Sequence, residues 1–172
     1  MSVLAGPFAV AAALLGLGGA SKAVEPADTA RALGTLGLPS SRLLVRAGGA
    51  AELVIGAGAL AFGNRLFALL VGLSYLGFLA FVVLALARHA PLSSCGCFGK
   101  VDTPPSAIHV TVNALAVVVA ATVVVAPGAG LPDVVGEQPL LGVPFVLLVA
   151  VGVYLTFLSL TLLPKTLAAG RS

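Results

Sequence analysis

Five long apolar runs alternate with short polar segments along the chain. Each run has close to the roughly 20 residues that an α-helix needs to cross a bilayer. The runs cover residues 3–20, 43–63, 66–87, 107–126 and 140–163. Only Asn64 and Arg65 separate the second run from the third, which leaves room for nothing longer than a tight turn. The pattern predicts an all-α, polytopic transmembrane helical bundle that forms a single domain over residues 1–172.

The longest polar stretch outside these runs covers residues 23–42. Pro26 suits the first turn of a short helix, with Leu33 and Leu36 on one side, that lies on the membrane surface and covers the bundle. An irregular loop is the alternative. The first apolar run could also be read as a signal peptide, but no Lys or Arg precedes it, and we expect a membrane-spanning helix instead.

Composition supports the membrane assignment. Hydrophobic residues make up 59% of the chain and charged residues 9%, whereas soluble domains are roughly half apolar and a quarter charged. The net charge of +3 comes from cations scattered over loops and helix ends, so we expect no nucleic-acid partner. The sequence predicts a multi-pass protein of the cell (inner) membrane in contact with lipid.

The cations are divided unequally between the two ends of the predicted bundle. Arg65 stands alone at the end that holds the N-terminus. The other end holds Lys22, Arg31, Arg42, Arg88, Lys100, Lys165 and Arg171. By the positive-inside rule this second end, with the loop of residues 88–105, is predicted to face the cytoplasm.

The two cysteines of the chain, Cys95 and Cys97, stand in that loop with one glycine between them. Oxidation would close a small, strained ring, which makes a disulfide easier to reduce. Lys100 and Arg88 would stabilise a thiolate, and Lys100 favours Cys97 as the attacking sulfur because it follows three residues later. Redox exchange is the leading interpretation. The alternatives are soft-metal capture by two thiolates and a structural disulfide, and we predict no resident metal ion.

Ionisable residues inside the predicted helices are costly at membrane depth and indicate function by default. Glu52 lies near the middle of the second run, on a face shared with Gly49 and Gly56. Small residues at steps of three and four allow another helix to approach closely, so Glu52 is expected to face protein.

Four polar residues are predicted to lie about one to three helical turns below the cysteine loop. They are Arg46, Glu52, His109 and Asn113. We expect them to line a polar cavity beneath Cys95 and Cys97. The alternative is that Arg46 extends to the membrane surface and Glu52 is neutralised in a structural hydrogen bond.

The run Ser94-Cys95-Gly96-Cys97-Phe98-Gly99 lies between the third and fourth predicted spans, with Glu52 in the second span and Asn113 in the fourth. In this arrangement the chain, over about residues 2–126, resembles the MauE family of methylamine-utilisation proteins. That family is related to the DoxX-like membrane proteins, so the resemblance implies a four-helix DoxX-like core plus a fifth helix.

The resemblance also implies a membrane thiol–disulfide oxidoreductase in which Cys95 and Cys97 exchange electrons with a thioredoxin-like partner, with Glu52 and Asn113 beneath them. No cofactor is required, although a quinone is compatible as an electron carrier. Family members often carry a basic residue just before the Asn, where this chain has Val112. The family role implies an extracytoplasmic partner, whereas the distribution of cations predicts that the cysteines face the cytoplasm. Transfer of reducing equivalents across the membrane would reconcile the two. A soft-metal transporter and a non-catalytic assembly factor are the alternatives from other classes.

Overall fold

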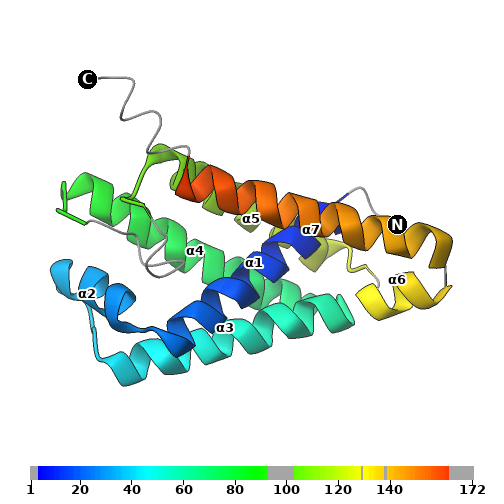
Figure 1. The fold of residues 1–172 in the computed structure, drawn as a ribbon, viewed down its shortest axis with the longest axis horizontal. Helices are drawn as coiled ribbons and strands as arrows, with labels where there is room; N and C mark the ends of the chain where they lie inside the picture. Colours follow the sequence, from blue (N-terminus) through cyan, green and yellow to red (C-terminus); the bar gives the residue numbers. More distant parts are fainter. Residues whose placement is uncertain (1–3, 93–102, 129, 138, 163–172) are drawn as a thin grey trace.

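The computed structural model describes residues 4–92, 103–128, 130–137 and 139–162 (Figure 1). The described residues form helices and no strand, which confirms the all-α fold. In chain order the helices are α1 (Ala5–Val24), α2 (Ala27–Thr35), α3 (Arg42–Phe62), α4 (Arg65–Ala87), α5 (Ala107–Val125), α6 (Leu131–Glu137) and α7 (Pro139–Thr161).

Five of these helices are long and apolar enough to cross a membrane, namely α1, α3, α4, α5 and the Gly142–Thr161 part of α7. The prediction of a multi-pass membrane protein is therefore confirmed, with most helix ends within about two residues of those expected. The main difference is at the end of α1, which continues to Val24 and so includes Lys22. Helix α6 lies between the fourth and fifth apolar runs, in a polar segment where the sequence pattern predicted no helix.

Local hydrogen bonds explain the sharp turn between α3 and α4. The Asn64 side chain caps α4 by accepting a hydrogen bond from the Phe67 backbone N–H at 3.1 Å. Gly63 ends α3 with a φ of +57°, a conformation that glycine adopts at little cost. These two residues reverse the chain within the tight turn that the sequence predicted.

Helix α2 lies at one end of the bundle, beside the end of α4 (Figure 1). Its buried face carries Ala30 and Ala32, and Leu36 follows it, also buried. The Arg88 guanidinium donates a hydrogen bond to the Leu36 carbonyl at 3.0 Å and so ties this end of α2 to the end of α4. The short covering helix is thus confirmed over the irregular loop.

Helix α1 runs through the middle of the bundle, between α3 and α7 (Figure 1). It packs mainly on α3, while α4 packs mainly on α5. The buried Tyr75 hydroxyl of α4 donates a hydrogen bond to the Ala11 carbonyl of α1 at 2.8 Å, which links the two pairs. Tyr154 of α7 lies on the outside and is 61% exposed. The core is therefore built around α1, and the outer faces of the other helices remain apolar, as lipid contact requires.

Candidate functional site

The backbones of α1 and α3 touch along a line of small residues. A Cβ atom added at Gly19 would lie 2.5 Å from the Gly49 carbonyl oxygen, and one added at Gly56 would lie 2.5 Å from the Ala12 carbonyl oxygen. Neither distance is compatible with a real side chain, so only glycine permits this approach. The predicted seam on the Glu52 face is confirmed.

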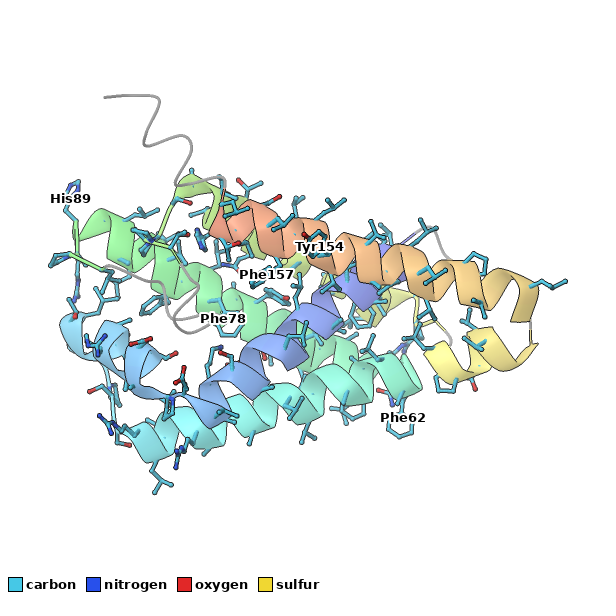
Figure 2. The ribbon with its side chains drawn as sticks, in the orientation of Figure 1. Phe62, Phe78, His89, Tyr154 and Phe157 are labelled. Carbon is cyan, nitrogen blue, oxygen red and sulfur yellow. The ribbon has the colours of Figure 1, made fainter. Side chains whose placement is uncertain are left out.

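A buried ion pair lies at the edge of this seam. Lys22 Nζ is 2.6 Å from Glu52 Oε2, and the two side chains are 8% and 15% exposed. The same Nζ lies 4.3 Å from the centroid of the Phe78 ring, a cation–π contact; Figure 2 shows Phe78 on the α4 ribbon near α1. The close approach of the two backbones thus brings a cation of α1 onto the carboxylate of α3.

The ion pair faces a small cavity of about 30 Å³, here called the polar cavity. Helix α5 contributes His109 and Asn113, both buried. The hydroxyl oxygen of Ser106, the residue just before α5, lies 2.9 Å from His109 Nδ1. The structure therefore brings together Glu52, His109 and Asn113 as expected, and adds Lys22 to them.

Arg46 does not join this group. Its side chain is exposed on α3, and it is not among the described residues that line the polar cavity. Arg46 and Glu52 are six positions apart, a rotation of about 240° around a helix, so the two side chains leave α3 on different sides. The expected cation of the cavity is supplied by α1 instead.

Sequence reasoning placed Lys22 in a polar loop and counted it among the cations of the cysteine end. The structure corrects this, because Lys22 is buried inside α1. A signal was present in the sequence: Lys22 follows Gly19 by three residues and so shares the face that meets α3. What hid the residue was the assumption that the first helix ends where the apolar run ends.

Cys95, Cys97 and Lys100 lie outside the described residues. The residues on either side of their segment are fixed at the same end of the bundle. Leu92 is buried in a cluster with residues of α2 and α4. Thr103 is buried and donates a hydrogen bond from its hydroxyl to the Leu160 carbonyl at 2.7 Å.

Leu160 also lines the polar cavity, so the chain leaves the cysteine segment at a residue bonded to the cavity wall. Arg88, expected to stabilise a thiolate, lies just after α4 and bonds to the Leu36 carbonyl. Figure 2 shows the nearby His89 pointing away from the bundle. Within the described part of the chain, no three His, Cys, Asp or Glu residues are grouped in a way that could hold a metal ion.

Comparison with known protein families gives one finding. The family model described as methylamine utilisation protein MauE matches residues 1–126. The matched region includes α1 to α5, and with them the ion pair, His109, Asn113 and both cysteines; α6 and α7 follow it. No curated protein and no solved structure matches the chain.

Proposed function

The chain belongs to the MauE family, and from this premise we propose that it is a membrane thiol–disulfide oxidoreductase. Cys95 and Cys97 form the redox pair and exchange electrons with a thioredoxin-like partner, carrying reducing equivalents across the membrane. The observation that carries the proposal is the placing of both cysteines in one segment between α4 and α5. Support comes from Thr103, which anchors the end of that segment beside the polar cavity.

The exchange proceeds in two displacements. The Cys97 thiolate attacks one sulfur of the partner's disulfide, which forms a mixed disulfide and releases one partner thiolate. The Cys95 thiolate then attacks the Cys97 sulfur, which closes the Cys95–Cys97 disulfide and releases the second partner thiolate. Two electrons and two protons pass from this chain to the partner, and every step is reversible.

The polar cavity supports the proposal because burying its charged residues costs free energy, which indicates that they serve a function. Removal of a lysine and a glutamate from water is unfavourable by several kcal/mol per ion, and ionisable groups at membrane depth usually serve function. The cavity volume of about 30 Å³ has room for about two water molecules. Water held between His109 and Glu52 would give the thiols a nearby route for taking up and releasing protons.

A redox titration tests the proposal. The purified protein is equilibrated at a series of potentials, and free thiols are trapped with a mass-tagged maleimide. We expect a reversible two-electron transition between about −300 and −120 mV, the range of exchange catalysts, and its loss in Cys97→Ser. The Ser94→Ala variant, changed just before the pair, is the matched control and keeps the transition.

Two results would contradict the proposal. Thiols that never oxidise, with a metal ion retained by the wild type but not by Cys97→Ser, would favour soft-metal transport. A disulfide that resists reduction throughout would make the cysteines a structural clip in a non-catalytic assembly factor. In the proposed case, Cys95→Ser traps a mixed disulfide with a thioredoxin-like protein.

A further inference from the structure

A second cavity lies against the other side of the buried ion pair. It has a volume of about 320 Å³ and lies between α2, α3 and α4; we call it the α2 cavity. Lys22, Glu52 and Phe78 line both this space and the polar cavity. The ion pair therefore forms a partition with a polar cavity on one side and a larger space on the other.

The walls of the α2 cavity are mostly apolar. Phe78 and Phe81 stand one turn apart on α4 and supply two aromatic side chains to its lining. The Ser74 hydroxyl, also in the lining, donates to the Leu70 carbonyl of its own helix. The charged groups that the described residues give to this cavity are thus concentrated at one wall, in the Lys22–Glu52 pair.

The α2 cavity opens sideways between two membrane-spanning helices. Gly48 of α3 and Gly77 of α4 both line it, and both are exposed on the surface of the bundle. A Cβ atom at either position would meet nothing within 4 Å. Thr29 and Leu33 of α2 also contribute to the lining. A ligand that enters between α3 and α4 arrives from the lipid and must itself be lipid-soluble.

We propose that the α2 cavity binds the head of a lipid-soluble quinone, which exchanges electrons with the cysteine pair. A flat ring fits beside the two aromatic side chains, and a ring carbonyl can accept a hydrogen bond from Lys22. The Lys22 ammonium has three N–H donors, and one of them donates a hydrogen bond to Glu52 Oε2. Small-molecule pockets begin at roughly 300 Å³, so the cavity has room for the head while the tail remains in the lipid.

A lipid acyl chain is a poorer match for this wall, because it has no group to pair with a lysine or a glutamate. The contrast with another cavity is informative. A space of about 490 Å³ lies between α1, α5 and α7, and the described residues lining it include no charged side chain. That space suits acyl chains, whereas the α2 cavity has a charged inner wall.

The redox step of this inference rests on the proposed function. The partner's dithiol first reduces the Cys95–Cys97 disulfide, which is the reverse of the exchange described above. The Cys95 and Cys97 dithiol then loses two electrons and two protons as the S–S bond forms again. The quinone gains both, and its two carbonyl oxygens become hydroxyls. The Lys22–Glu52 pair, which borders both cavities, stands where protons pass from the polar cavity to the quinone oxygen.

A photolabelling experiment tests the site without depending on redox activity. The full chain carrying Cys95→Ser and Cys97→Ser is placed in phosphatidylcholine nanodiscs with a short-tailed azido-quinone. After illumination, labelled peptides are identified by mass spectrometry. We expect labelling of α3 and α4 beside the α2 cavity and competition by excess decylubiquinone.

Leucine at the open glycines provides the discriminating variants. Gly77→Leu and Gly48→Leu put a side chain into empty space at the cavity and should reduce competable labelling about tenfold, a loss of about 1.4 kcal/mol in binding. The matched control is Gly136→Leu in α6, where a Cβ atom also meets nothing within 4 Å but lies away from this cavity. Circular dichroism checks that all three variants keep the wild-type helix content.

Labelling that decylubiquinone does not compete, or that Gly77→Leu and Gly48→Leu leave unchanged, would overturn the site. Labelling confined to the cavity between α1, α5 and α7 would overturn it as well. The outcome is separable from that of the proposed function. If decylubiquinone competes with the label but the wild-type thiols never oxidise, the quinone site stands and the proposed oxidoreductase function fails. If the thiols cycle but no competable label is found, the oxidoreductase function stands and the quinone site fails.

Discussion

Removal of one member of the Lys22–Glu52 pair should destabilise the protein more than removal of both. Lys22→Met retains a flexible apolar stem and deletes the charge, leaving Glu52 buried without its cation. Such a break in a buried pair costs about 3–5 kcal/mol. Both side chains are less than a sixth exposed, so little of this is lost to solvent screening. The contact between Lys22 and the Phe78 ring adds about 1 kcal/mol.

The magnitude can be followed by thermal unfolding in detergent micelles, with circular dichroism as the probe. For a chain of this size each kcal/mol shifts the midpoint by about 2–4 °C. We therefore expect a fall of about 6–20 °C for Lys22→Met and a similar fall for Glu52→Gln, which leaves Lys22 without its anion. The double variant leaves two neutral side chains and should recover at least half of the loss.

Arg46→Met is the matched control, because it removes a cation from an exposed position on α3. Its midpoint should stay within about 2 °C of the wild type, as for most surface substitutions. The reasoning would be refuted if Lys22→Met lost no more than Arg46→Met. It would also fail if the double variant lost the sum of the two single losses, because the two residues would then act independently.

Two further substitutions test the packing around α1. Gly56→Val should force α1 and α3 apart, because its Cβ would lie 2.5 Å from the Ala12 carbonyl oxygen. We expect the free energy of unfolding to fall by at least about 2 kcal/mol. Gly48→Ala is the control and should change it little, because a Cβ atom at Gly48 meets nothing within 4 Å. Tyr75→Phe removes the hydrogen bond to the Ala11 carbonyl and should cost about 1 kcal/mol by the same unfolding assay. A stable Gly56→Val protein, or a Tyr75→Phe protein with unchanged stability, would contradict these readings.

The spans could be predicted because a membrane imposes a length and a composition on each helix. The faces of α3 and α5 could be predicted as well, since Gly49, Glu52 and Gly56 repeat at helical spacing. In α5 the same steps of three and four relate His109, Asn113, Ala116 and Ala120, which are buried in the structure. These features follow from periodicity alone.

Other features depend on which helices become neighbours, and one sequence does not determine that. The partner of Glu52 is Lys22, thirty residues earlier, and not Arg46, which is closer in the chain. Helix α1 meets α3 along its glycines, and this contact decides which cation is buried. The α2 cavity likewise arises from three helices whose individual sequences carry no sign of a shared space.

Glu52 follows Lys22 by thirty positions in the chain, and this separation also sets an order of synthesis. Lys22 leaves the ribosome well before the carboxylate that it will pair with, so α1 reaches the translocon with an unmatched cation near its end. That cation acts on the orientation of the first helix as any flanking lysine does. The ion pair that buries the ammonium forms only after α3 has been synthesised. The burial of Lys22 thus depends on a helix that is made later than its own.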